Sequence, residues 1–354
     1  MKRPIYIAGK DVSKELCFIA DIAANHDGDL NRAYKLIELA KESGADVAKF
    51  QNFVAKKIVS KKGFDQMGGQ LSHQSAWKKS VFETYEDASI SMEWTSKLKE
   101  KCDKVGIEYM TSPYDFDSID AVDPYVKAFK IGSGDITWLE ILEYIARKNK
   151  PVIMATGASD FEDVKRAYEA IERINNQIVL MQCNTNYTGS KENFKYINLN
   201  VLKTFKKYFP DAVLGLSDHT PGHATVLGAI ALGARVIEKH FTDDNSRSGP
   251  DHKFSMNPQT WGEMVKRSEE LFEALGSEVK KIEDNELDTV IVQRRALYLT
   301  KDKKKGQVIK TEDLFPVRPI QNDGIPPYEK DKLVGKLLNK DLLKDNYLRW
   351  EDLD

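Results

Sequence analysis

The chain has 354 residues, with 53 Lys and Arg against 55 Asp and Glu and a formal net charge of −2. This balance excludes a general electrostatic attraction to nucleic acid or to an anionic membrane surface. The hydrophobic share of 41% is that of a globular protein, and no apolar run approaches the roughly 20 residues needed to cross a bilayer. Cys17, Cys102 and Cys183 form no paired framework, so we expect a protein of the reducing cytoplasm with no nucleic-acid or membrane partner.

Short apolar runs recur through the first three quarters of the chain. Each carries β-branched or aromatic residues, and near-continuous apolarity is typical of strands that are covered on both faces. They predict eight strands, at residues 17–23, 46–51, 107–112, 126–133, 151–156, 178–183, 212–217 and 235–241.

The stretches between these strands are amphipathic with a helical period. Asp29 is a candidate N-cap for the first helix, and Pro221 is expected in the first turn of another. The long, polar and aromatic segment 52–90 is the exception, and we expect it to decorate the rim of the fold. The predicted helices span residues 30–43, 91–104, 137–148, 160–174, 198–208, 221–232 and 257–275.

Eight strands that alternate with helices within roughly 250 residues predict a (β/α)₈ TIM barrel. A doubly wound open sheet is the main alternative, but eight repeats are many for such a sheet, and no GxGxxG follows the first strand. A charged stretch at 277–289 then precedes short strands and turns. We therefore predict an α/β chain with a barrel domain over residues 1–280, a linker over 281–292 and a small, mostly β domain over 293–354.

Nearly every predicted strand ends in a polar or charged residue. In a barrel of this type the chemistry collects at the carboxyl ends of the strands. An ordinary loop residue explains any one of these side chains equally well, whereas a functional site better explains the complete ring.

Two histidines, His219 and His240, end consecutive predicted strands. A barrel would bring them side by side, where two imidazoles are good ligands for a divalent metal such as Mn²⁺. Two capping or core histidines are the alternative. The nearby acids Asp21, Glu238 and Asp251 favour the metal, either as ligands or as groups that orient the ligands.

Two lysines, Lys49 and Lys130, end otherwise apolar strands. Pointed into the barrel mouth, they would form an anion cradle with Thr111, Ser133 and the glycine amides that flank Ser133, which suits a phosphate or a carboxylate. The alternative is that both lysines extend their ammonium groups to solvent.

The segments that carry these residues resemble the sialic acid (nonulosonate) synthases, and the tail at 293–336 resembles the antifreeze-like (SAF) domain that ends those enzymes. The resemblance runs over nearly the whole chain in the right order. It rests on FIADIAANHDGDLNRAYKLIELAKESGADVAKFQ (18–51), KIGSGD (130–135), GLSDHTPG (215–222) and IEKHFTDDNSRSGPDHKFSMNP (237–258).

The resemblance implies a metal-dependent condensation of phosphoenolpyruvate (PEP) with an open-chain 2-acetamido sugar, typically N-acetylmannosamine. The products would be a nine-carbon α-keto acid and phosphate, with cleavage of the C–O bond of PEP. The resemblance also implies Mn²⁺, or alternatively Mg²⁺ or Co²⁺, as the metal. It further implies a homodimer in which the antifreeze-like domain of one chain covers the barrel of the other.

The resemblance also assigns residues, position by position. His219 and His240 match the metal ligands, and with Asp21 and Glu238 they form the catalytic set. The PEP-contacting positions are Lys49, Thr111, Lys130, Ser133, Thr185 and Ser217, and the sugar-side positions are Gln51, Tyr187, Asp251 and Arg318.

Three departures from the family pattern bear on the site. Asp21 stands where the family most often has Glu, so its carboxylate reaches one methylene less far. Ala155 replaces a serine expected against PEP, which leaves Thr156 as a candidate substitute. CNTNYTG (183–189) replaces the more usual C-T-S-x-Y-P, so the sugar pocket can differ.

Three alternatives remain open from the sequence. The acceptor can be a 2,4-diacetamido-2,4,6-trideoxyhexose, which gives legionaminate or pseudaminate. Synthases of eight- or seven-carbon keto acids share the barrel, but they lack the antifreeze-like tail. A non-catalytic carbohydrate-binding protein would not need both histidines and both lysines together.

Overall fold

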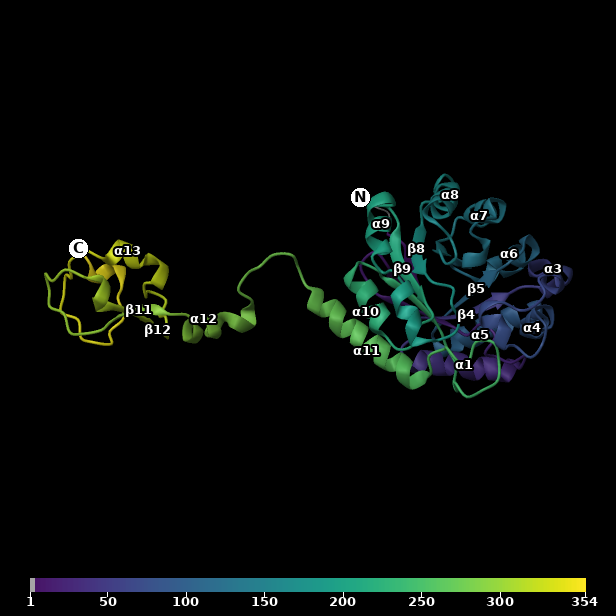
Figure 1. Ribbon diagram of the computed structural model, residues 1–354, viewed down its shortest axis with the longest axis horizontal. Helices are drawn as coiled ribbons and strands as arrows, with labels where there is room; N and C mark the ends of the chain where they lie inside the picture. Colours follow the sequence, from purple (N-terminus) through teal and green to yellow (C-terminus); the bar gives the residue numbers. More distant parts are fainter. Residues whose placement is uncertain (1–3) are drawn as a thin grey trace. The chain divides into compact units, whose positions relative to one another are not determined.

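The structure is a computed structural model that describes residues 4–354 and, at residues 72 and 76, the backbone alone. The chain divides into two compact units, a larger one that ends at Gly276 and a smaller one over Ser277–Asp354 (Figure 1). Across the described residues, no helix is long and apolar enough to cross a membrane.

The larger unit is built on one sheet of eight parallel strands. Its strand order is β5-β4-β3-β10-β9-β8-β7-β6, and β5 and β6 also contact each other, which nearly closes the sheet. The predicted barrel is confirmed. The strands are β3 (Cys17–Asp21), β4 (Val47–Asn52), β5 (Glu108–Pro113), β6 (Phe129–Ile131), β7 (Val152–Ala155), β8 (Ile178–Cys183), β9 (Val213–Asp218) and β10 (Val236–His240).

Helices surround this sheet and alternate with the strands (Figure 1). Asp29 caps α1 as expected, because its carboxylate accepts from the N–H groups of Asn31 and Arg32. The prediction for 221–232 was too long, because α10 begins only at Ala224 and Pro221 precedes it. The helices are α1 (Leu30–Glu42), α5 (Met92–Val105), α6 (Phe116–Val122), α7 (Leu139–Ala146), α8 (Phe161–Glu172), α9 (Val201–Tyr208), α10 (Ala224–Ala231) and α11 (Pro258–Leu275).

An N-terminal hairpin, β1 (Tyr6–Ile7) and β2 (Lys10–Asp11), was not predicted. Its Ile7 packs into one buried cluster with Ile19, Val47 and Val236, which point into the barrel. A larger buried cluster lies between the strands and the helices. The interior is therefore apolar where the strands begin, and the hairpin contributes to that apolar half.

Segment 52–90 forms an excursion between β4 and α5, with α2 (Ala55–Ile58), α3 (Lys61–Gln66) and α4 (Val81–Ala88). It has a small core of its own around Ala55, Val59 and Val81. Its His73 ring lies 4.8 Å from the ring of Tyr187, in the loop that follows β8. The segment therefore reaches the end of the barrel where the strands finish.

The smaller unit pairs β11 (Ala296–Leu299) with β12 (Leu314–Val317) in antiparallel fashion and adds α12 (Leu287–Gln293) and α13 (Lys330–Leu333). Its core includes Leu297, Leu314, Ile325 and Leu348. Short 3₁₀ turns in the two units are Ser72–Ala76, Asp123–Tyr125, Ser133–Asp135, Lys191–Tyr196, Asp284–Glu286, Thr311–Asp313, Pro327–Glu329 and Trp350–Asp352.

Candidate active site at the barrel mouth

Four charged side chains point into the barrel where the strands end. Side chains alternate between the two faces of a strand, so Asp21 on β3 and Lys49 on β4 share the inner face with the apolar residues two positions earlier. Glu238 on β10 and Lys130 on β6 do the same. All four side chains are 5% exposed or less. The lysines therefore do not extend to solvent, which rules out that alternative.

These four charges form one network. Lys49 Nζ lies 2.6 Å from Asp21 Oδ2 and 3.8 Å from Glu238 Oε2. Lys130 Nζ lies 3.2 Å from Glu238 Oε1, which also accepts a hydrogen bond of 3.0 Å from the hydroxyl of Ser217. Two cations thus face two anions, and the network by itself carries no net charge.

The network sets different pKa values for its two carboxyl groups. Burial alone would raise the pKa of Glu238, but Lys130 and Lys49 bring it down to about 2. Burial raises the pKa of Asp21 above its ordinary value, although Lys49 opposes this. Glu238 is therefore ionised at neutral pH, and Asp21 is the carboxylate that is more readily protonated.

His219 and His240 lie beside this network, with ring centroids 5.4 Å apart. Burial lowers the pKa of each to about 3, so both rings are neutral at physiological pH. His219 Nδ1 lies 2.8 Å from the carbonyl oxygen of Asn184, which can only accept, so Nδ1 carries the proton and Nε2 has a free lone pair. Among the described residues, His240 Nδ1 is buried without a hydrogen-bond partner.

Two neutral imidazoles with free lone pairs fit a divalent metal of the borderline class. Within residues 4–354, no group of three or more His, Cys, Asp or Glu side chains is arranged to hold a metal ion. The protein would therefore supply two imidazoles, and water or substrate would complete the coordination. Open positions of this kind are typical of catalytic rather than structural metal sites.

Of the expected sugar-side residues, Tyr187 and Asp251 lie beside the histidines, and Gln51 contacts the charged network. Gln51 Nε2 donates to Asp21 Oδ2 at 3.4 Å, and the Tyr187 ring lies 4.3 Å from the ring of His219. Asp251 accepts from the N–H of Ala24 at 3.1 Å, and burial raises its pKa to about 7.

Thr111 does not line the mouth, contrary to the expectation for a PEP contact. Its hydroxyl donates to Asn52 Oδ1 at 2.7 Å, on the face of the sheet that meets α5. The next residue, Ser112, takes the inner face, and its buried hydroxyl has no partner among the described residues. The sequence placed Ser112 with Thr111 at the end of this strand but assigned the PEP contact to Thr111, although the alternation of Ser112 with the inward Met110 favours Ser112.

Thr156 is no substitute for the missing serine, because its hydroxyl donates to the backbone oxygen of Met181 at 2.9 Å. The next residue, Gly157, was missed. Its N–H donates to Ser133 Oγ at 2.9 Å, and a Cβ at this position would lie 2.4 Å from Thr185 Cγ2. The glycine therefore lets two of the expected PEP-contacting side chains, Ser133 and Thr185, approach each other.

The remaining predicted site residue, Arg318, belongs to the smaller unit. It follows β12, its side chain is exposed, and its Nε donates to the backbone oxygen of Gln293 at 2.6 Å.

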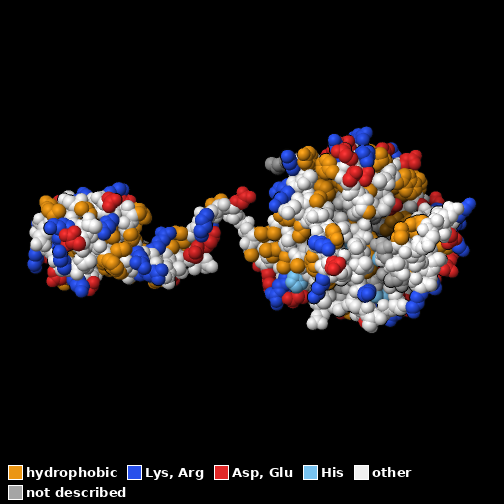
Figure 2. All heavy atoms as spheres, viewed as in Figure 1, with side chains coloured by type: hydrophobic (Ala, Val, Ile, Leu, Met, Phe, Trp, Pro, Cys, Tyr) orange, Lys and Arg blue, Asp and Glu red, His pale blue; other side chains and the backbone are white. Residues whose placement is uncertain are grey.

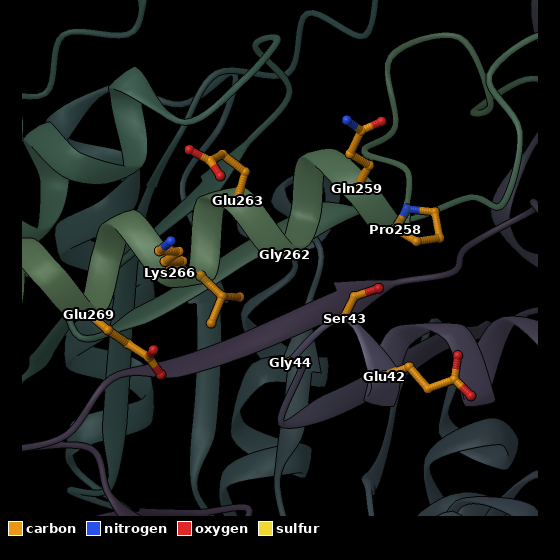
Figure 3. Close-up of a pocket in the computed structure, with 10 residues that line it drawn as sticks. Glu42, Ser43, Gly44, Pro258, Gln259, Gly262, Glu263, Lys266 and Glu269 are labelled. Carbon is orange, nitrogen blue, oxygen red and sulfur yellow. The ribbon is translucent and has the colours of Figure 1, made fainter.

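A shallow groove on the outside of the barrel is unrelated to this site. It lies between the end of α1 and the helix α11, and Glu42, Ser43, Gln259 and Glu263 are among the residues that line it (Figure 3). No predicted site residue lines it. On the visible face of the larger unit, acidic and basic side chains are interspersed (Figure 2), as the near-zero net charge suggests.

A TIM barrel whose mouth gathers two lysines, two carboxylates and two neighbouring imidazoles defines a barrel enzyme with a charged active site. The comparisons with known proteins identify the group. Residues 36–280 match the NeuB family and residues 294–354 match the SAF domain, and the chain belongs to the NeuB family. It is an enzyme, a synthase of this family.

The relatives carry related names. The chain is 36% identical to an N,N'-diacetyllegionaminic acid synthase of Legionella pneumophila, over 97% of this chain and 96% of the relative. It is 31% identical to the human N-acetylneuraminate-9-phosphate synthase, over 96% and 93%. A solved N-acetylneuraminic acid (sialic acid) synthetase from Leptospira borgpetersenii is 25% identical with a TM-score of 0.71, over 82% of this chain and 96% of that one.

Proposed function

We propose that the chain condenses PEP with an open-chain 2-acetamido sugar to give a nine-carbon α-keto acid and phosphate. The observation that carries this proposal is the buried network of Lys49, Lys130 and Glu238 beside two neutral imidazoles. The family supports it, because the named relatives are synthases of such acids.

PEP would lie against the lysines and the ring of hydroxyls. Lys49 and Lys130 can donate to its phosphate and carboxylate, with Ser133, Ser217 and Ser112 as further donors. Because the two lysines are already balanced by Asp21 and Glu238, a trianionic substrate needs additional positive charge. A divalent metal is the source that we propose.

His219 and His240 would hold the metal, with Mn²⁺ the candidate that we favour. The ion would polarise the aldehyde oxygen of the sugar, a contribution of several kcal/mol. The enol carbon of PEP would attack the aldehyde carbon, whose oxygen becomes a hydroxyl by taking up a proton. Water would add to the carbon that bears the phosphate, and phosphate would leave with its C–O bond broken and with a proton that the added water supplies. Asp21 or Glu238 would orient that water and take its proton, typically worth ~10²–10⁴-fold.

A 2,4-diacetamido-2,4,6-trideoxyhexose is the acceptor that we favour over N-acetylmannosamine. Two relatives, 36% and 35% identical, are named as diacetyllegionaminic acid synthases. Arg32, in the first turn of α1, and Arg247, in the loop that follows β10, are already paired with Asp243 and Asp27. This leaves neither arginine free for a sugar phosphate, so we favour an unphosphorylated acceptor.

We also propose that the enzyme works in the cytoplasm as a homodimer. In this dimer the smaller unit of one chain would cover the barrel mouth of the other. Arg318 supports the arrangement, since it is an exposed guanidinium in that unit and would meet the sugar from outside.

The test is PEP-dependent phosphate release with a panel of acetamido sugars, with product masses measured, in Mn²⁺ and in chelator. We expect turnover that requires metal and is fastest with the diacetamido sugar; faster turnover with N-acetylmannosamine would reverse that order.

Lys130→Met should abolish phosphate release. Lys127→Met, three residues earlier with an exposed side chain paired to Glu108, is the matched control and should retain it. No release with any sugar, in a chain that still binds one, would leave the carbohydrate-binding alternative.

A further inference from the structure

A second buried ion pair lies next to the two histidines in the sequence, on the outer face of the sheet. Asp218 precedes His219 at the end of β9, and Lys239 precedes His240 at the end of β10. The two are register partners in the sheet, and their side chains are 0% and 1% exposed. Since Ser217 and Glu238 face the mouth, Asp218 and Lys239 face outward, toward α10.

The contacts of this pair bracket His219 on both sides. Lys239 Nζ contacts Asp218 Oδ2 and also donates to the backbone oxygen of Thr220 at 2.6 Å. Asp218 Oδ1 accepts from the N–H of Thr220 at 3.2 Å, and Thr225 on α10 donates to Asp218 Oδ2 at 2.7 Å. One lysine, itself next to His240, thus holds the residues before and after His219.

Stability alone is a weak reason to bury such a pair, because apolar residues of similar volume are often as stabilising or more so. Among the described residues, the hydrogen bonds of the pair go to Thr220 and Thr225 and not to a side chain of the mouth, so the proposed chemistry does not use the pair directly. What it does fix is the relative position of the ends of two neighbouring strands. A ligand pair on separate strands depends on that position, since metal binding needs ligands held in the correct geometry.

We propose that Asp218 and Lys239 are positioning residues that set the separation of the two imidazoles and thereby the metal affinity of the site. This inference rests on the proposed function, because it takes His219 and His240 as the metal ligands. The two proposed roles fall on opposite faces of the sheet. The inward side chains of β9 and β10 would contact metal and substrate, and the outward pair Asp218 and Lys239 would hold the backbone of these strands in place.

The experiment measures Mn²⁺ binding without substrate, from the electron paramagnetic resonance signal of free Mn²⁺, together with the thermal midpoint of the metal-free protein. The double variant Asp218→Leu with Lys239→Met should stay folded and bind Mn²⁺ about 10–100-fold more weakly, the usual cost of losing groups that orient metal ligands. The matched control is Asp313→Leu with Lys303→Met, a buried pair of the smaller unit, which should leave Mn²⁺ affinity unchanged.

A folded double variant with unchanged Mn²⁺ affinity would overturn the inference and leave the proposed function standing. If that variant does not fold, Thr225→Val decides, because it removes the hydrogen bonds of the Thr225 hydroxyl to Asp218 and Thr220 and keeps both charges. Weaker Mn²⁺ binding by Thr225→Val supports the positioning role, and unchanged binding refutes it. A wild-type protein that binds no Mn²⁺ would overturn the metal part of the proposed function, and the inference with it.

Discussion

The two halves of the barrel interior are built from the same strands yet have opposite chemistry. Where the strands begin, Ile19 and Val236 pack with the hairpin residue Ile7 in an apolar cluster. Two positions further along the same strands, Asp21 and Glu238 hold a charged network. The first half lowers the free energy of folding, whereas the second half costs desolvation, and the proposed chemistry is the reason that we infer for its presence.

The largest effect should come from the histidines. His240→Ala removes one imidazole and leaves its neighbours Asp21 and Asp251 in place. If several kcal/mol of transition-state stabilisation pass through the metal, turnover falls by about 10³-fold or more. Phosphate release measures this, and a nearly unchanged thermal midpoint shows that the fold survives. Full activity of a metal-stripped His240→Ala variant would contradict the metal role.

The comparison between the halves is sharpest on β3, where Ile19 and Asp21 lie two residues apart. Ile19→Ala should reduce the free energy of unfolding by about 2–5 kcal/mol, with kcat unchanged per folded molecule. Asp21→Asn should do the reverse, with a small effect on stability and a large loss of kcat. Chemical denaturation and steady-state rates decide, and a kcat loss in Ile19→Ala as large as that in Asp21→Asn would show that the halves are not separable.

The sequence predicted the eight strands and the barrel well because near-continuous apolar runs and the helical period of 3.6 residues are local signals. It missed α6, which has only seven residues, FDSIDAV, and the two-residue strands of the hairpin, because such short elements carry too little pattern. Their existence depends on packing against the rest of the unit, which local periodicity does not express.

In the charged half, the sequence predicted which residue types gather but not always which side chain faces inward. Thr111 and Ser112 are adjacent hydroxyls, and a shift of one position reverses the face. Thr156 was misjudged for the same reason. The pairing of Asp218 with Lys239 was also beyond the sequence, since it follows from the register of β9 against β10.

A smaller effect on activity is expected from Arg318, which belongs to the smaller unit and to neither half of the barrel interior. Arg318→Ala should raise the apparent KM for the sugar about tenfold, roughly the worth of one charge-assisted hydrogen bond, and leave the KM for PEP nearly unchanged. Steady-state kinetics with each substrate varied in turn measures this. Lys305→Ala, an exposed cation of the same unit, is the control. Equal changes in both KM values would remove Arg318 from the sugar site.

The smallest effect that we expect is a loss of stability of the smaller unit at low pH. Its buried Asp313 is a charged residue for which we propose no catalytic role. Burial would raise its pKa, but hydrogen bonds from Lys301 and Lys303 hold it well below its ordinary value. The unfolded chain therefore takes up the proton first. The stabilisation by Asp313 is complete above the ordinary pKa of about 4 and declines below it. For one proton, the unfolding equilibrium constant rises by at most about tenfold for each pH unit of acidification. Amide hydrogen exchange of Leu297 and Leu299, corrected for the intrinsic rate, should show this decline, and Lys303→Met should flatten it because the folded pKa then approaches the unfolded one. Equal slopes in the two proteins would show that Asp313 does not govern the acid response.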